Sequence, residues 1–284
     1  MDSIFSAIIL GIVEGLTEFL PVSSTGHLIL TGHLLGFTGE KAATFEIIIQ
    51  LGAILAVVVL YWERFLGLLK TDPARSFSGL RGIWLLILTS IPASVLGLLA
   101  HDFIKEHLFG PQTVAWALGV GALAIFAVEA WRNGAIVGNF RTANKSQARP
   151  RHDRTRYKGL DAITPALALG IGCFQCLALW PGFSRSAATI MGGMLLGAER
   201  KTAAEYSFVA AVPIMFAATG YDMLKNYQLF SVADLPFLAV GFVVSFLAAW
   251  IAVKGFITLL GRLTLRPFAV YRLVLAAAVL IFLV

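Results

Sequence analysis

The sequence predicts an all-α polytopic membrane protein: an inverted-topology repeat with about six transmembrane helices and two re-entrant helix-turn-helix segments. Three observations predict it. Apolar residues make up 58% of the 284 residues, charged residues only 13%, and the mean hydropathy is +0.82, which is more apolar surface than one soluble core can hide. Much of the apolar sequence gathers in spans of membrane-crossing length. Two further apolar segments are each broken by a proline.

Of six apolar spans, four are long enough to cross the hydrocarbon of a bilayer as helices, and two shorter ones, 206–221 and 268–284, are expected to cross it as well. The six spans cover residues 45–61, 82–99, 114–131, 206–221, 236–260 and 268–284. The two broken segments, residues 4–35 and 162–196, differ from them. In each, an apolar helix stops at a proline (Pro21 or Pro181), a Ser- and Gly-rich turn follows, and a second short apolar helix begins. We expect these two segments to enter the membrane and return to the side they left.

The basic residues support this layout, because cytoplasmic loops carry an excess of Lys and Arg. With both broken segments re-entrant, 17 of the 22 Lys and Arg residues fall on one side. They are the four basic residues of 64–81, the eight of 132–158, and Arg200, Lys201, Arg262, Arg266 and Arg272. We therefore expect that side to be cytoplasmic and both termini to lie outside. Because the charge gathers between apolar spans, the net charge of +6 does not indicate nucleic acid as a partner.

The chain also shows a weak internal repeat. A shift of about 160 residues places Glu14 on Gln175, Ser23 on Ser184 and Thr25 on Ser186. We expect one integral-membrane domain of two repeats, residues 1–132 and 159–284, each with a re-entrant segment and three transmembrane helices. A basic cytoplasmic linker at residues 133–158 would join them. Three crossings in the first repeat would turn the second upside down, as in many transporters whose broken helices meet near the midplane.

Two acidic residues lie in the first broken segment. Glu14 and Glu18 are four residues apart, so both carboxylates project from one helix face. A charged carboxylate in a membrane segment costs about 2.5–3.5 kcal/mol, and the two would repel each other. A divalent cation would relieve both problems, because hard cations prefer carboxylate oxygens. The alternative is that the acids pair with other helices.

Polar residues follow Pro21. Ser23, Ser24 and Thr25 precede a new helix, where a hydroxyl is a natural N-cap and free backbone N–H groups form an anion site. His27 lies in the first turn of that helix and could act as general acid, general base or nucleophile near neutral pH.

The second broken segment repeats this plan with a different charge. Arg185 replaces the acids, and its planar fork suits phosphate oxygens. Ser184, Ser186 and Thr189 could donate hydrogen bonds to the same anion. The alternative is that Arg185 only pairs with Glu18. Together the two segments suit a diphosphate, because phosphoryl transfer depends chiefly on positioning and charge stabilisation. The membrane setting indicates that the substrate is a lipid.

Residues 14–27 (EGLTEFLPVSSTGH) and 181–186 (PGFSRS) resemble the two signature motifs of bacterial undecaprenyl-diphosphatases, the bacitracin-resistance proteins. The resemblance covers essentially the whole chain. It implies hydrolysis of undecaprenyl diphosphate to undecaprenyl phosphate, which recycles the carrier lipid of peptidoglycan synthesis, and a divalent cation, Mg²⁺ or Ca²⁺, held by Glu14 and Glu18. The implied catalytic residues are Glu18, Ser24, His27 and Arg185. The implied substrate-binding residues are Ser23, Thr25, Ser184, Ser186 and Thr189.

The resemblance further implies a homodimer in the bacterial inner membrane, surrounded by lipid, with an active site open to the periplasm. Phe183 and Ala187 depart from the residues usual at those positions and would narrow the pocket or remove a weak hydrogen bond. Two mechanisms stay open: attack by Ser24 activated by His27, or attack by water activated by His27. The alternative function is a polyprenyl-phosphate transporter or flippase built on the same repeat.

Overall fold

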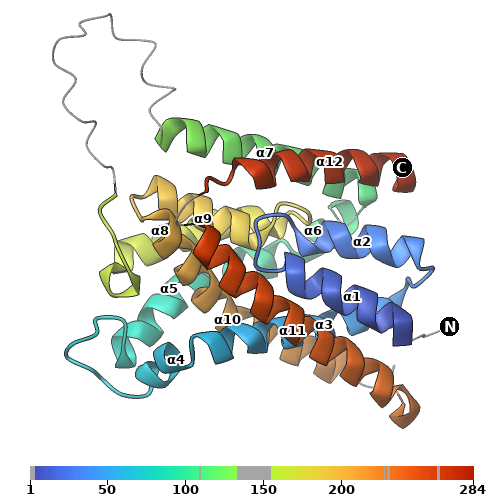
Figure 1. Ribbon diagram of the computed structural model, residues 1–284, viewed down its shortest axis with the longest axis horizontal. Coiled ribbons are helices and arrows are strands. Elements are labelled where there is room, and N and C mark those ends of the chain that lie inside the picture. Colours follow the sequence, from blue (N-terminus) through green and yellow to red (C-terminus); the bar gives the residue numbers. More distant parts are fainter. Residues whose placement is uncertain (1–3, 109, 133–154, 227, 229–230, 261–262) are drawn as a thin grey trace, which may run out of the picture.

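The computed structural model describes residues 4–108, 110–132, 155–226, 228, 231–260 and 263–284. Within these ranges the regular elements are helices, and six of them are long and apolar enough to cross a membrane. They are α3 (Glu40–Leu60), α5 (Gly79–Leu99), α7 (Pro111–Arg132), α10 (Arg200–Asn226), α11 (Leu235–Leu260) and α12 (Arg266–Leu283) (Figure 1). The predicted all-α polytopic membrane fold is confirmed.

Each broken segment forms short helices separated by a turn. The first contains α1 (Ile4–Thr17) and α2 (Ser24–Leu34). The second contains α8 (Pro165–Gln175), the 3-10 helix η3 (Cys176–Leu179) and α9 (Arg185–Leu195). Both turns contain the expected proline, which lacks a backbone N–H and cannot continue a helix. These segments are too short to span a bilayer as single helices.

The helices of the two halves follow the same order: two short helices, then three long ones. Two further short helices, α4 (Trp62–Leu68) and α6 (His101–His107), follow α3 and α5 and were not predicted. Most of the expected linker, residues 133–154, lies outside the described residues. The inverted orientation of the halves in a membrane stays a prediction. The N-terminal end of α1 and the C-terminal end of α12 lie at the same end of the molecule (Figure 1).

The two halves interlock through their short helices. Helix α1 packs along α11, α8 packs along α5, and α2 and α9 contact α12 and α7. Glycines allow the close approaches: a Cβ on Gly11 would lie 2.7 Å from the carbonyl oxygen of Gly241, and one on Gly172 would lie 2.5 Å from that of Thr89. Each of these four short helices therefore contacts a long helix of the other half.

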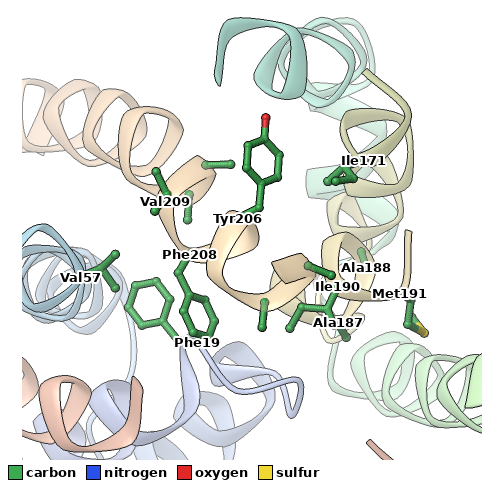
Figure 2. Packing of buried hydrophobic residues seen from close by; sticks show 14 of the residues in the cluster. Phe19, Val57, Ile171, Ala187, Ala188, Ile190, Met191, Tyr206, Phe208 and Val209 are labelled. Carbon is green, nitrogen blue, oxygen red and sulfur yellow. The ribbon is translucent and has the colours of Figure 1, made fainter. Parts of the chain in front are cut away.

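A hydrophobic cluster lies directly beneath the two turns. The ring of Phe19, in the first turn, meets Phe208 of α10 edge to face, with centroids 5.4 Å apart. Figure 2 shows these rings beside side chains from α3 (Val57) and α9 (Ile190). The polar end of Tyr206 is satisfied by Thr89, at 2.7 Å. The cluster gives both turns a packed base.

Outside the long helices, Asp161 links the two halves. Its carboxylate accepts a hydrogen bond from the Phe77 N–H at 2.8 Å and forms an ion pair with Arg64 at 2.9 Å. Partial burial raises the pKa of Asp161, but the hydrogen bonds from Phe77 and Arg64 outweigh it and hold the pKa below its ordinary value.

Replacing Gly11 with Ala should destabilise the fold by about 1–3 kcal/mol, because the added methyl forces α1 away from the backbone of α11. The measurement is the thermal unfolding midpoint of the full chain in detergent. Gly119→Ala is the matched control, since no atom lies within 4 Å of a Cβ there, and it should leave the midpoint unchanged or raise it slightly. Equal midpoints for the two variants would contradict the close packing of α1 on α11.

Candidate active site

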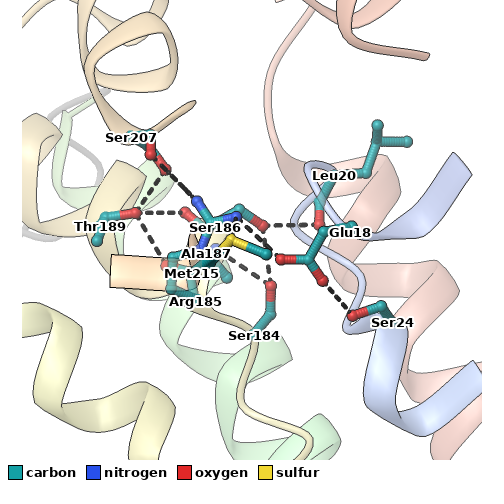
Figure 3. Close-up of polar contacts among 10 residues, drawn as sticks. All are labelled: Glu18, Leu20, Ser24, Ser184, Arg185, Ser186, Ala187, Thr189, Ser207 and Met215. Carbon is teal, nitrogen blue, oxygen red and sulfur yellow. Dashed lines mark hydrogen bonds and ion pairs between the residues drawn. The ribbon is translucent and has the colours of Figure 1, made fainter. Parts of the chain in front are cut away.

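The two proline turns meet, and each places a serine at the start of a helix. Ser23 and Ser184 are the N-caps of α2 and α9, and their hydroxyls accept hydrogen bonds from the N–H groups of Gly26 and Ala187. Both serines have positive φ, 72° and 77°, a conformation strained for residues other than glycine. The turns touch directly, because the Ser186 hydroxyl donates to the Leu20 carbonyl at 2.7 Å (Figure 3).

A chain of polar contacts crosses from one half to the other. The Ser24 hydroxyl donates to Glu18 Oε2 at 2.6 Å, and Glu18 Oε1 forms an ion pair with Arg185 Nη2 at 3.0 Å (Figure 3). Arg185 Nη1 then donates to the Ser207 carbonyl at 3.1 Å. The side chains of Glu18 and Arg185 are only 7% and 15% exposed, so water screens the ion pair weakly.

A cavity of about 170 Å³ lies over this chain of contacts. Its lining comes from both turns, from α3 and from α10: Glu18, Ser23, Ser24, Thr25, Gln50, Ala178, Pro181, Gly182, Ser184, Arg185 and Met215. The N-termini of α2 and α9 both begin here, and Arg185 adds a fixed positive charge. Arg185 Nε is buried and has no hydrogen-bond partner among the described residues. The cavity therefore suits an anion.

Four of the predicted residues do not line the cavity. Thr189 lies behind Arg185, where its hydroxyl donates to the Arg185 carbonyl at 2.9 Å and pairs with the Ser207 hydroxyl at 2.6 Å. Ser186 is fully buried between the turns. Thr189 supports the backbone of Arg185, Ser186 holds the two turns together, and neither lines the cavity. The other two are Glu14 and His27.

Glu14 is 1% exposed, and neither of its carboxylate oxygens has a hydrogen-bond partner among the described residues. Glu18, Glu46 and Arg185 are near enough to interact with it electrostatically. Unpartnered buried carboxylate oxygens suit a hard cation. The described residues contain no group of three or more His, Cys, Asp or Glu side chains placed to hold a metal ion. A cation here would take Glu14 and Glu18 from the chain and its remaining oxygen ligands from substrate or water.

His27 contacts helix α12. Its Nδ1 lies 2.7 Å from the Ser23 carbonyl oxygen, so Nδ1 carries a proton and donates. Its Nε2 lies 2.7 Å from the Tyr271 hydroxyl, and the two rings stack. The structure pairs Ser24 with Glu18 instead of His27, and the catalytic role expected of His27 stays a prediction. Both ring nitrogens are taken by Ser23 and Tyr271, and Glu18 is the partner of Ser24.

Arg272 is the main site residue that the sequence misplaced. It was assigned to a cytoplasmic loop, but it lies inside α12, is 0% exposed and contacts both turns. An unpaired arginine in an apolar span was the available signal, since such residues usually face the protein interior. Phe183 and Ala187 are buried and do not line the cavity. Neither narrows it, and the Phe183 ring lies beside Arg272, 6.0 Å from the guanidinium carbon.

Gln50, Ser207, Met215 and Tyr271 also belong to the site and were not predicted. No motif surrounds them in the sequence. They reach the site only because α3, α10 and α12 pack against the two turns.

Comparison with known proteins supports the resemblance in the motifs. The sequence profile of the family described as Bacitracin resistance protein BacA matches residues 7–278. A protein named undecaprenyl-diphosphatase from Maridesulfovibrio salexigens is 73% identical over 99% of both chains. Proteins of the same name from Nitratidesulfovibrio vulgaris and Lawsonia intracellularis are 67% identical over 99% of both chains, and 54% identical over 95% of this chain and 94% of the other. The chain belongs to the bacitracin resistance protein BacA family.

Proposed function

We propose that this chain is an undecaprenyl-diphosphatase, which hydrolyses undecaprenyl diphosphate to undecaprenyl phosphate and inorganic phosphate. One observation carries the proposal: Ser24, Glu18 and Arg185 form a continuous chain of contacts at the wall of an anion-suited cavity. The names of the full-length relatives agree with it. Transport of a lipid alone would not require a hydroxyl hydrogen-bonded to a carboxylate, nor an arginine paired with that carboxylate.

Arg185 and the N-termini of α2 and α9 bind the diphosphate oxygens. The Ser24 oxygen attacks the terminal phosphorus while Glu18 accepts the hydroxyl proton at Oε2. A bond forms between that oxygen and phosphorus, the bond from phosphorus to the bridging oxygen breaks, and undecaprenyl phosphate leaves with the electron pair. Water then attacks the phosphorus of the phosphoserine, and the bond from phosphorus to the Ser24 oxygen breaks. Glu18 returns its proton to that oxygen, which restores the Ser24 hydroxyl and releases phosphate. Arg185 stabilises the charge on the transferred group throughout.

Glu14 and Glu18 would hold a divalent cation, Mg²⁺ or Ca²⁺. The unpartnered oxygens of Glu14 support this assignment. When bound, the cation supplies charge neutralisation for the diphosphate, which carries more negative charge than one arginine can balance.

We place the enzyme in the bacterial cytoplasmic membrane as a homodimer surrounded by lipid, with the cavity open to the periplasmic side and both termini outside. The excess of Lys and Arg in the opposite loops supports this orientation. In that position the enzyme would recycle the carrier lipid of peptidoglycan synthesis and confer resistance to bacitracin.

Replacing Ser24 with Ala should lower kcat about a thousandfold or more, because the nucleophile is lost, while KM changes little because Arg185 and the helix N-termini remain. The measurement is phosphate release from undecaprenyl diphosphate by the purified chain in detergent. Ser90→Ala is the control, because that hydroxyl bonds the Leu86 carbonyl away from the cavity. Parental activity in Ser24→Ala would exclude Ser24 as the nucleophile, and an inactive parent chain would exclude the phosphatase.

Replacing Arg185 with Lys should lower kcat/KM about 100-fold or more. A lysine keeps the charge, but it cannot direct one donor to Glu18 and others to phosphate as a guanidinium does. The same phosphate-release assay measures the change, with Arg64→Lys, which alters the peripheral pair with Asp161, as the matched control. If Arg185→Lys and Arg64→Lys were equally active, the arginine would not bind the phosphate.

Removing divalent cations with a chelator should abolish phosphate release, and Mg²⁺ or Ca²⁺ should restore it. Glu14→Gln should raise the cation concentration needed for half-maximal activity by about tenfold or more, because one charged ligand is lost. Full activity of the parent chain after chelation, or an unchanged cation requirement in Glu14→Gln, would contradict the assignment of Glu14 and Glu18 as ligands.

A further inference from the structure

Arg272 donates its hydrogen bonds to backbone carbonyl oxygens. The acceptors are Leu118 and Ala117 of α7, at 3.2 Å each, Gly182 at 3.1 Å and Pro21 at 3.4 Å. No ion pair within the described residues includes Arg272, although its side chain is completely buried. A buried guanidinium without a carboxylate is costly unless its donors are satisfied. Here four carbonyl groups from three separate segments satisfy them.

Two of these acceptors occupy the same place in the two turns. Pro21 lies two residues before Ser23, and Gly182 lies two residues before Ser184. These are the two serines with positive φ. A strained backbone of this kind persists only where its surroundings determine it. Arg272 therefore holds the equivalent carbonyl oxygen of each strained turn, that of Pro21 through Nη1 and that of Gly182 through Nη2.

The surroundings of Arg272 are shaped for a guanidinium. Gly121 of α7 leaves room for it, since a Cβ at that position would collide with Arg272 Nη2. The planar fork fixes several donors in different directions, which allows one side chain to reach both turns and α7 together. A lysine ammonium, a single point charge, cannot keep all of these directions at once.

The neighbouring residue on α12, Tyr271, also contacts the first turn, through His27. Tyr271 bonds His27, which in turn donates to the Ser23 carbonyl. Neither Arg272 nor Tyr271 lines the cavity. Both residues contact the turns that carry the reacting groups, Arg272 directly and Tyr271 through His27, and neither would touch a ligand in the cavity.

We propose that Arg272 is a positioning residue for the phosphatase reaction: by holding the Pro21 and Gly182 carbonyls, it fixes Ser24 and Arg185 relative to each other. The inference rests on the proposed function, because it assigns the nucleophile and the phosphate-binding arginine. Ser24 and Arg185 each follow their held carbonyl by three residues, so a shift of either turn misplaces a reacting group.

The test is Arg272→Lys in the full-length chain, measured by two readouts. We expect kcat to fall about 10- to 100-fold with KM within about twofold, because a displacement of about 1 Å costs that much rate. Hydrogen–deuterium exchange should also rise in both turns, residues 19–27 and 180–188, because both lose a shared restraint. A kcat within threefold of the parent, or faster exchange in neither or only one turn, would overturn the proposal.

Arg200→Lys is the matched control, because Arg200 holds the buried Glu129 through two hydrogen bonds away from the turns. It should lower the unfolding midpoint without changing kcat or turn exchange. If it lowered kcat as much as Arg272→Lys does, the effect would be general destabilisation and the proposal would fall.

Gly121→Ala is a second variant that keeps every atom of the arginine but displaces it. It should reproduce the loss of kcat and the faster exchange of both turns, and normal values for both would overturn the proposal. The exchange readout does not depend on activity. An inactive parent with slow, Arg272-dependent turn exchange would therefore overturn the proposed function and leave the restraint by Arg272 established.

Discussion

The site depends on the ion pair between Glu18 and Arg185, which come from different halves of the chain. Each charge lies in a poorly hydrated region, where either one alone would be strongly destabilising, by about 3–5 kcal/mol when its partner is removed. The pair therefore requires both turns to be folded and adjacent. Because the Ser24 hydroxyl donates its hydrogen bond to the same carboxylate, the contact that joins the two turns also orients the reacting hydroxyl.

The two turns have the same backbone plan and carry different chemistry. Ser23 and Ser184 share a positive φ and the N-cap role, and both turns expose a helix N-terminus to the cavity. The first half brings carboxylates and the hydroxyl, whereas the second brings a cation. Two identical halves would give two acidic turns or two basic turns. Two acidic turns would repel a diphosphate, and two basic turns would lack a carboxylate to accept the proton. The difference between the halves makes the site suited to catalysis.

The sequence predicts the parts of this structure that depend on local chemistry. The six long helices follow from apolar length, and the broken segments follow from Pro21 and Pro181. The pair of Glu18 with Arg185 was only the alternative to a phosphate-binding role for that arginine, and the structure contains the pair. The hydrogen-bond partners of Ser24 and His27 could not be predicted, because sequence spacing does not show in which direction a side chain points. Arg272 lies near the start of its span, so the expected excess of Lys and Arg in cytoplasmic loops placed it in such a loop. Only the packing of α12 on α7 and the turns shows its burial.

The ion pair between Glu18 and Arg185 joins the two turns and forms the site, and a double-mutant cycle on the free energy of unfolding tests this most directly. The cycle compares the parent chain with Glu18→Gln, Arg185→Met and the double variant, all in detergent. We predict that each single change destabilises strongly and that the double change costs less than their sum by about 1–3 kcal/mol, because neither charge is then left unpaired. Additive effects, within about 0.5 kcal/mol, would show that the two residues do not interact and would contradict the account.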